Sequence, residues 1–166
     1  SREETPSWSR DGRWLYFSSN RSGTFQIWKL VIDQPAQVLQ VTYGGGTNPH
    51  ESADGQQLYY TKGGPANLEI WSRPVNGDEE SRVLGPIHAA PPGAWVPDPD
   101  GIYYIEPAWR IAYYRFATGA TRTIVPLPQD AVVANPGLAL SPDGRWLLYG
   151  QRDRSVSDIM LIENFR

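Results

Sequence analysis

Apolar residues occur along the chain in short runs that alternate with polar turn residues. Four of these runs are rich in aromatic and aliphatic side chains: RWLYFSS, QQLYYTK, IYYIEP and RWLLYGQ. Within a run the apolar residues occupy both parities, as Trp14 and Tyr16 do against Leu15 and Phe17. Because successive residues of a strand point to opposite faces, this pattern predicts strands in sheets that are packed on both faces. No segment shows a sustained helical period, so we expect essentially no helix.

An Asp-Gly pair stands at the start of each run. The four pairs are Asp11-Gly12, Asp54-Gly55, Asp100-Gly101 and Asp143-Gly144, and they are 43, 46 and 43 residues apart. Glycine tolerates the positive φ of tight turns between twisted strands, so each pair predicts a hairpin turn. A repeat of this length is typical of four-stranded β-propeller blades.

A third strand follows in each repeat. Ile27, Ile70 and Ile159 each lie 15 residues past the repeat glycine, whereas Ile111 lies 10 past Gly101. We therefore predict a shortened second strand or hairpin loop in the third repeat. Fourth strands are predicted at QVLQVT, SRVLG and TRTIVPL, and the last repeat ends at Phe165-Arg166 without one.

The predicted fold is all-β, with fifteen strands in four consecutive antiparallel propeller blades, the last lacking its outer strand. The expected blades cover about 1–44, 45–87, 88–128 and 129–166 of one propeller segment. First strands are expected near Ser7, His50, Trp95 and Ala139.

Two of the repeats carry a family resemblance. PSWSRDGRWLYFSSNRSGTFQIW and LSPDGRWLLYGQRDRSVSDIM resemble the WD-like Asp-Gly repeats of TolB-like β-propellers. The closing segment SDIMLIENFR also resembles the end of the C-terminal propeller of bacterial winged-helix regulator proteins. These resemblances imply a bacterial protein in which this part serves as a sensor or interaction surface. The compartment, cytoplasm or periplasm, depends on upstream sequence, because the chain begins at Ser1 without a Met and we expect it to be part of a longer protein.

Composition excludes several classes of site. With no cysteine, the chain can form no disulfide, thiol nucleophile or thiolate metal site. A net charge of −3 with no basic run disfavours direct binding to nucleic acid or to an anionic membrane surface. We expect neither of these partners.

Candidate chemistry is sparse, and we predict no enzyme activity, cofactor or metal site. The pattern Gly-x-Ser-x-Gly of a nucleophile elbow does not occur. Asp98 and Asp100 resemble the start of a calcium loop but lack the later acid that such a loop needs, so we interpret them as turn residues. Gly44-Gly45-Gly46 is interpreted as a flexible link between the first two blades. His50 and Glu51, on a predicted innermost strand, are the ligand-binding candidates that face the channel.

The resulting hypothesis is a non-catalytic module that binds a protein, a peptide or a small ligand. Two alternatives remain open: the substrate-gating propeller of a prolyl-oligopeptidase-type hydrolase, or a propeller fragment with no activity of its own. TolB-like repeats usually form rings of more than four blades. Four blades would then be half of a ring, with an apolar face exposed at each end, and we expect a homodimer that closes an eight-bladed ring.

Overall fold

The computed structural model describes residues 1–64, 66–87, 94–106, 109–128, 132–153 and 156–162. In these ranges the chain forms fifteen β-strands and no helix, which confirms the predicted all-β class. Among the described residues there is accordingly no helix that is long and apolar enough to cross a membrane.

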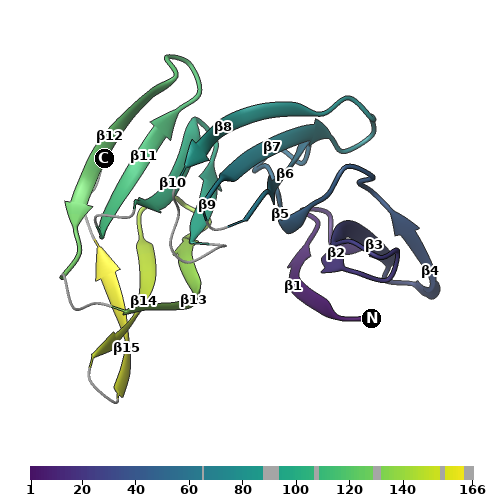
Figure 1. Ribbon diagram of the computed structural model, residues 1–166, viewed down its shortest axis with the longest axis horizontal. Helices are drawn as coiled ribbons and strands as arrows, with labels where there is room; N and C mark the ends of the chain where they lie inside the picture. The colour runs from purple at the N-terminus through teal and green to yellow at the C-terminus, as the bar shows by residue number, and fades with distance from the viewer. Residues whose placement is uncertain (65, 88–93, 107–108, 129–131, 154–155, 163–166) are drawn as a thin grey trace. The chain divides into compact units, whose positions relative to one another are not determined.

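The strands form four consecutive antiparallel sheets, each in simple sequence order (Figure 1). Blade one contains β1 (Glu3–Trp8), β2 (Trp14–Ser19), β3 (Gln26–Val31) and β4 (Gln34–Gln40). Blade two contains β5 (Thr47–Glu51), β6 (Gln57–Lys62), β7 (Leu68–Pro74) and β8 (Ser81–Ile87). Blade three contains β9 (Trp95–Asp98), β10 (Gly101–Glu106), β11 (Arg110–Arg115) and β12 (Ala120–Pro126). Blade four has three strands in the described ranges, β13 (Val132–Leu140), β14 (Leu147–Asp153) and β15 (Val156–Ile162).

The blades group into two compact units. The first comprises Ser1–Gly63 and Glu69–Gly85, and the second comprises Gly64–Leu68 and Pro86–Arg166. Blades one and two therefore lie mainly in the first unit, and blades three and four in the second. The predicted blade boundaries stay a prediction, but each predicted run lies in its own sheet.

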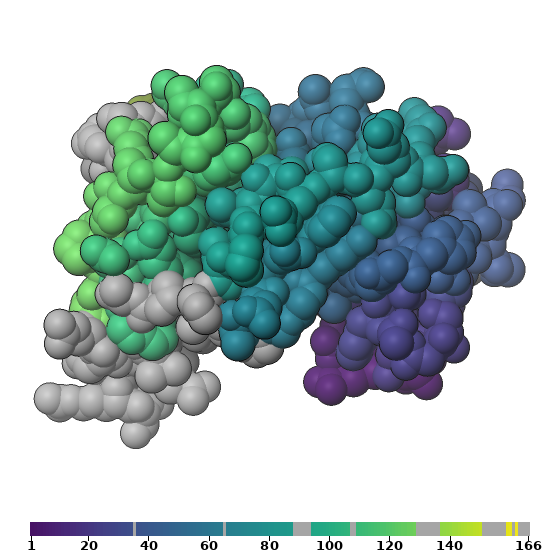
Figure 2. All heavy atoms as spheres, turned by 45° about the horizontal axis from the view of Figure 1, so that its top comes forward, coloured from purple at the N-terminus to yellow at the C-terminus, as the bar shows by residue number. Residues whose placement is uncertain are grey.

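In the first unit, blade two packs on one face of blade one, and Figure 2 shows the two blades in direct contact. Tyr16 and Ile27 of blade one form a cluster with Leu58 and Tyr60 of blade two. These four side chains are at most 1% exposed. Fully burying side chains of this size contributes roughly 1.5–3 kcal/mol each, so this cluster is the main source of stability between the two blades.

The second unit has an equivalent core between blades three and four. Tyr103, Ile105 and Ile111 of blade three pack against Leu147 and Tyr149 of blade four. The rings of Tyr103 and Tyr113 lie 4.5 Å apart between centroids. The prediction that strands pack on both faces thus holds for β10, whose apolar residues of both parities are buried, whereas β2 has one buried and one partly buried face.

The Asp-Gly turn of blade one is built around Ser9. Ser9 Oγ donates to Asp11 Oδ1 (2.7 Å) and accepts from Trp14 N (2.9 Å), while Asp11 Oδ1 also accepts from Arg13 N (3.0 Å). Gly12 has φ +70°, which a side chain would disfavour. Blades two and four repeat these bonds with Ser52, Asp54, Ser141 and Asp143, and their glycines have φ +69° and +66°.

Blade three departs from this turn. Asp98 stands where the other repeats have serine and pairs directly with Gly101, leaving two residues in the loop. In blade one, four residues separate Ser9 from Trp14, which pair through Ser9 N and Trp14 O (3.0 Å). Gly101 consequently begins β10 and is not among the glycines with positive φ. Asp100-Gly101 is therefore not the structural equivalent of the other three pairs.

The early position of Ile111 also has its explanation in a loop. β10 and β2 both have six residues. The loop after β10 is shorter than the loop after β2, because Glu106 pairs with Arg110 whereas Ser19 pairs with Gln26. Of the two predicted alternatives, the hairpin loop is the shortened element. Ile27, Ile70 and Ile111 all remain at 0% exposure.

Candidate interaction surface

Glu51, a predicted ligand candidate, joins blade two to blade one. Its carboxylate accepts hydrogen bonds from Tyr16 Oη (2.9 Å) and from the backbone N of Arg10 (2.6 Å). Arg10 Nε also donates to Ser52 O (3.2 Å). The Glu51 side chain is buried, at 7% exposure for the residue, so these two donors replace water around its charge. Burial, and then the nearby Glu51 carboxylate, raise the pKa of Tyr16 well above its ordinary value.

His50, the other predicted candidate, is partly buried beside this contact. Its backbone pairs with Tyr59 and that of Glu51 with Leu58, so the two side chains leave β5 on opposite faces. Burial, followed by the positive charge of Arg10, lowers the pKa of His50 to about 4. The imidazole is therefore neutral at pH 7. A role for His50 in ligand binding stays a prediction.

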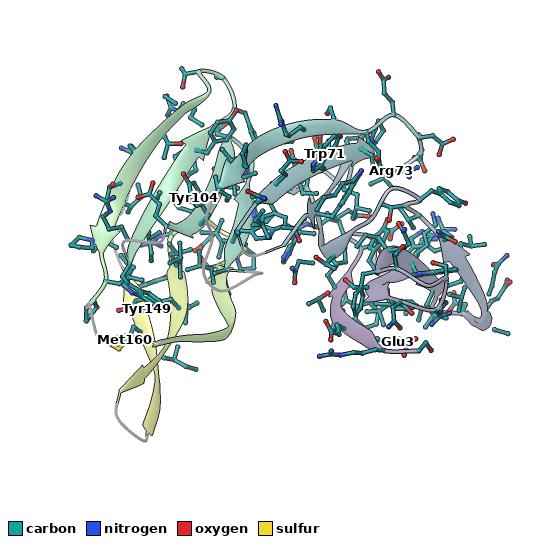
Figure 3. All side chains as sticks on the ribbon, in the orientation of Figure 1. Glu3, Trp71, Arg73, Tyr104, Tyr149 and Met160 are labelled. Carbon is teal, nitrogen blue, oxygen red and sulfur yellow. The ribbon has the colours of Figure 1, made fainter. Side chains whose placement is uncertain are left out.

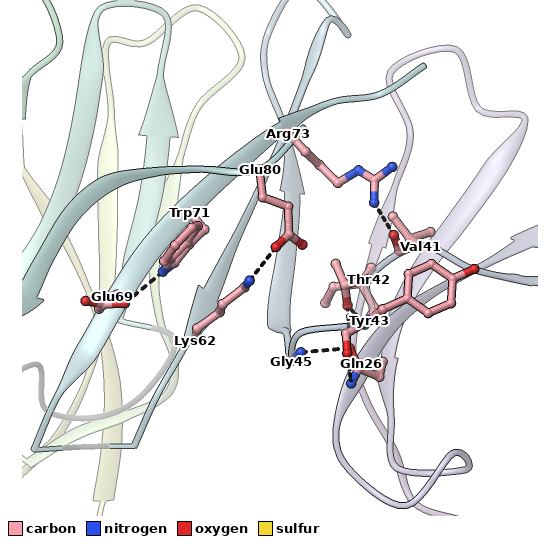
Figure 4. Close-up of polar contacts among 11 residues, drawn as sticks. Gln26, Val41, Thr42, Tyr43, Gly45, Lys62, Glu69, Trp71, Arg73 and Glu80 are labelled. Atoms are coloured by element: carbon pink, nitrogen blue, oxygen red, sulfur yellow. Dashed lines mark hydrogen bonds and ion pairs between the residues drawn. The ribbon is translucent and has the colours of Figure 1, made fainter. Parts of the chain in front are cut away.

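The connection from blade one to blade two is held by one side chain. Gln26 Oε1 accepts from Thr42 Oγ1 and Gly45 N, both at 2.9 Å, and Gln26 Nε2 donates to Tyr43 O at 3.3 Å (Figure 4). A Cβ at Gly46 would lie 2.9 Å from Ile27 Cγ1. The glycine segment predicted to be a flexible link is therefore tied to β3. Its third glycine is needed because the connection passes close to the core.

A side chain of blade two also forms a hydrogen bond to this connection. The guanidinium of Arg73 on β7 donates to the carbonyl oxygens of Val41 and Gly77 and pairs with Asp78 Oδ1 at 2.8 Å. Figure 3 places Arg73 near Trp71 on the same strand. Lys62 Nζ lies 4.3 Å from the ring centroid of Trp71 and forms an ion pair with Glu80. The charged groups of Arg73 and Lys62 therefore have partners within the first unit, and we assign them a structural role.

Asp98 and Asp100 lie at the blade-three turn as predicted. Asp98 Oδ1 accepts from Tyr113 Oη (3.0 Å) and from Asp100 N (3.2 Å). Burial, followed by Asp98, raises the pKa of Tyr113 above its ordinary value. Within the ranges that the structure describes, no group of three His, Cys, Asp or Glu side chains is arranged to hold a metal ion. His88 lies outside the described residues.

A recess of about 570 Å³ lies beside this turn in the second unit. It is lined by Pro99, Asp100, Arg115, Phe116 and Ala117. Its residues come from the β9–β10 loop, the last residue of β11 and the β11–β12 loop, and the two loops are connected by the hydrogen bond from Phe116 N to Asp100 O at 2.9 Å. Its lining combines one carboxylate, one guanidinium and an aromatic ring, so it offers a small ligand both charge and an apolar surface.

The outer face of blade one is an apolar surface that blade two does not cover. We define it as Trp8, Leu15, Phe17, Trp28 and Leu30. Strand register places them together, since Trp8 pairs with Leu15, Leu15 with Leu30 and Phe17 with Trp28, on the side opposite Tyr16 and Ile27. Trp8 is 60% exposed, and the other four are partly buried.

Arg21 covers part of this face. Its guanidinium carbon lies 5.1 Å from the ring centroid of Phe17 and 5.0 Å from that of Trp28. Glu3 holds the guanidinium from the side at 3.1 Å. Stacking of this kind contributes roughly 0.5–1 kcal/mol at an exposed site. Arg21 does not cover Trp8, so the part of the face around Trp8 remains available for contact.

Blade four also has an outer face, which we define as Ala139, Leu148 and Ile159. Ala139 pairs with Leu148, and Ile159 pairs with Gly150, on the side opposite Leu147 and Tyr149. Ile159 is 77% exposed, although Ile27, Ile70 and Ile111 at the same repeat position are 0% exposed. Sequence analysis expected an apolar face at each end of the segment. It did not single out Trp8 or Ile159.

These blade-to-blade contacts are those of a known fold. The chain superimposes on TolB from Acinetobacter baumannii with a TM-score of 0.73 over 97% of its length, at 16% identity and covering 40% of that protein. The fold is a TolB-like β-propeller. A prolyl endopeptidase structure is similar over 97% of this chain and 26% of its own, with a TM-score of 0.68 and 16% identity. At such identities the likeness concerns the fold alone.

Sequence comparison adds one relative to these structural similarities. No family model matches it. An uncharacterized protein of Agrobacterium fabrum is 36% identical over 85 residues, which cover 50% of this chain and 28% of that protein. The chain thus spans between about a quarter and two fifths of the length of these three proteins. The resemblance to winged-helix regulators stays a prediction.

Proposed function

We propose that this chain is a non-catalytic β-propeller module that acts by binding, and that a second copy of the chain is one of its partners. The observation that supports this proposal is the pair of uncovered outer faces on blades one and four. A protein that exposes a tryptophan and an isoleucine at positions that are buried or partly buried in its other repeats has surface suited to another protein. Glu51, one of the two ligand-binding candidates, accepts a hydrogen bond from Tyr16 across the junction of blades one and two.

Self-association follows from the same faces. If the blades are shaped for a ring larger than four, two copies related by a twofold axis would close an eight-bladed ring, with each outer face used once. Light scattering coupled to size exclusion tests this directly. We expect a mass of twice the 18.6 kDa of the chain. A mass of 18.6 kDa that does not change with concentration would exclude the dimer.

The absence of catalysis needs its own test. We expect no hydrolysis of peptide, ester or glycoside substrates by this polypeptide. Turnover that survives repurification and is lost in His50→Ala would contradict the proposal, because the neutral imidazole of His50 is a side chain that can accept a proton.

A second candidate is the substrate-gating propeller of a larger hydrolase. The structural similarity to a prolyl endopeptidase supports it. A gating propeller would belong to a chain with a separate hydrolase domain, so the open reading frame that encodes this segment decides between the two. A nucleophile-elbow motif upstream or downstream of the segment would favour the gating role.

A further inference from the structure

We propose that the two outer faces dock head to tail, with the outer face of blade one in one copy lying against the outer face of blade four in a second copy. This inference rests on the proposed self-association and names its contact. The argument starts from the junction between blades one and two, because that junction shows which repeat positions meet.

In that junction, blade two presents the same repeat positions that blade one leaves uncovered. Leu58, Tyr60 and Trp71 lie 43 residues after Leu15, Phe17 and Trp28. Leu58 and Tyr60 are buried against Tyr16 and Ile27, and Trp71 packs on the same cluster. The outer face of blade one is therefore the half of a blade junction that normally receives the preceding blade.

Blade four supplies the complementary half. Tyr16 and Ile27 are the positions by which blade one receives blade two. Their counterparts in blade four, counted from the repeat glycine, are Leu148 and Ile159, which form the outer face of that blade. Blade one thus exposes the positions through which a blade contacts the preceding blade, and blade four exposes the positions through which a blade contacts the following blade. Two like ends do not complement each other in this way.

The polar contacts of the internal junction are replaced consistently at the ends. Glu51 receives hydrogen bonds from the Tyr16 hydroxyl and the Arg10 amide. The position of Glu51 is Trp8 in blade one, and the positions of Tyr16 and Arg10 are Leu148 and Pro142 in blade four. Leucine has no hydroxyl, and proline has no N–H to donate. The largely apolar indole of Trp8 would meet two apolar partners, so the end junction buries no carboxylate that needs these two donors.

The second unit already contains an apolar version of this contact. Leu140 occupies the position of Trp8 in blade four, pairs with Leu147 as Trp8 pairs with Leu15, and packs on the core that includes Tyr103. A large apolar side chain at this position therefore serves as a junction residue. The end junction that we propose belongs to the same class.

Two aspartate substitutions test the inference. Trp8→Asp and Ile159→Asp alter side chains that are 60% and 77% exposed in the single chain, so each should change folding stability by less than about 1 kcal/mol. Each should nevertheless convert the dimer to a monomer, because a charge would be buried in both junctions. Tyr43→Asp, which alters an aromatic residue that is 76% exposed and outside both faces, is the matched control and should remain dimeric.

Mixing the two variants separates head-to-tail docking from pairing of like faces. An equimolar mixture restores one intact junction, between the blade-one face of the Ile159→Asp chain and the blade-four face of the Trp8→Asp chain, so dimers should reappear. If Ile159→Asp alone remains dimeric, like faces are pairing, and the head-to-tail contact is refuted while self-association stands. A wild-type chain that is monomeric at every concentration refutes both proposals, and wild-type masses beyond the dimer refute the closed pair.

A cross-linking measurement needs no substitution within the faces. In the internal junction, Arg10 Cβ lies 3.8 Å from where a Cβ on Gly55 would stand. The equivalent neighbours across the end junction are Pro142 and the turn around Gly12, which includes the exposed Arg13. The chain has no cysteine, so Arg13→Cys and Pro142→Cys can be joined by a bismaleimide. We expect a cross-linked dimer from the mixture and none from either variant alone; cross-linking within a single variant would overturn the assignment.

Discussion

The two units each contain one buried hydrogen bond between a tyrosine and a carboxylate, but the bonds have different structural roles. In the first unit Tyr16 donates to Glu51 across the junction of two blades. In the second unit Tyr113 donates to Asp98 between two strands of one blade. Asp98 takes the place of the turn serine, and the turn is two residues shorter. The same pair of groups therefore connects repeats in one unit and stabilises a hairpin in the other, depending on a shift of one position along the strand.

The largest difference should appear at the turn glycines. A Cβ on Gly101 would lie 2.1 Å from the backbone oxygen of Tyr114 and 2.6 Å from Tyr113 Cζ, so Gly101→Ala should lower the free energy of unfolding by more than about 3 kcal/mol. Gly12→Ala meets no atom within 4 Å and loses about 1 kcal/mol through its positive φ. Urea unfolding measures both, and equal losses would show that the two turns are alike.

The next largest effects on stability should follow from removing the carboxylates of Glu51 and Asp98. Glu51→Ala leaves the Tyr16 hydroxyl without its acceptor, and Asp98→Ala does the same for Tyr113, so each should cost about 2–3 kcal/mol. Hydrogen exchange distinguishes the two variants. Protection should fall in both β2 and β6 in the Glu51 variant, and in β10 and β11 alone in the Asp98 variant. If the Glu51 variant loses protection in one blade only, the bond does not connect the blades.

A smaller effect concerns pH. The pKa of His50 is lowered to about 4 in the folded chain, against about 6.5 when unfolded. The unfolded state therefore binds the proton first, and stability that is fully present above pH 6.5 falls as the pH approaches 4. Because His50 is only partly buried, we expect a loss of about 1–2 kcal/mol over this range. His50→Gln should remove that slope, and an unchanged pH profile in the variant would assign the slope to other groups.

The smallest effect should be seen at the serine-type turns. The Ser52 hydroxyl, followed by the amide of Gln56, lowers the pKa of Asp54 below its usual range. Ser52→Ala should move the carboxylate NMR titration of Asp54 toward higher pH. Ser141 makes the first contribution to Asp143 in the same way, so Ser141→Ala is a second, independent case. No movement in either variant would mean that the backbone amides alone set these values.

Much of the fold could be predicted from the sequence because the repeat consists of residues with strong local conformational preferences. Glycines at positive φ, the serine and aspartate of the turn, and alternating aromatic strands act within a few residues of one another. The turn of blade three was the exception. Asp100-Gly101 has the same letters as the other pairs, but the replacement of serine by Asp98 removes the side chain that closes the longer loop.

The interaction surface was less accessible to sequence analysis. His50 and Glu51 attracted interest as polar neighbours on one strand, yet the burial of Glu51 depends on Tyr16 and Arg10 in another repeat. Trp8 and Ile159 have no unusual local sequence. Trp8 lies on the face of blade one that blade two does not cover, and Ile159 on the face of blade four that blade three does not cover. Exposure of this kind depends on which neighbouring blades are present.

The attachment of the connection to Gln26 has a consequence for how such a chain can grow. Gln26 and Thr42 belong to the same repeat as the connection that they hold. A duplication of that repeat would therefore copy both the connection and the side chains that bind it. Blade two shows how this inheritance can be lost. Glu69, at the position of Gln26, binds Trp71 Nε1 (2.9 Å) and Arg82 (3.0 Å) within its own sheet. Blade two thus differs from blade one in the residues that link a repeat to the next, while both blades keep the same Ser-Asp-Gly turn.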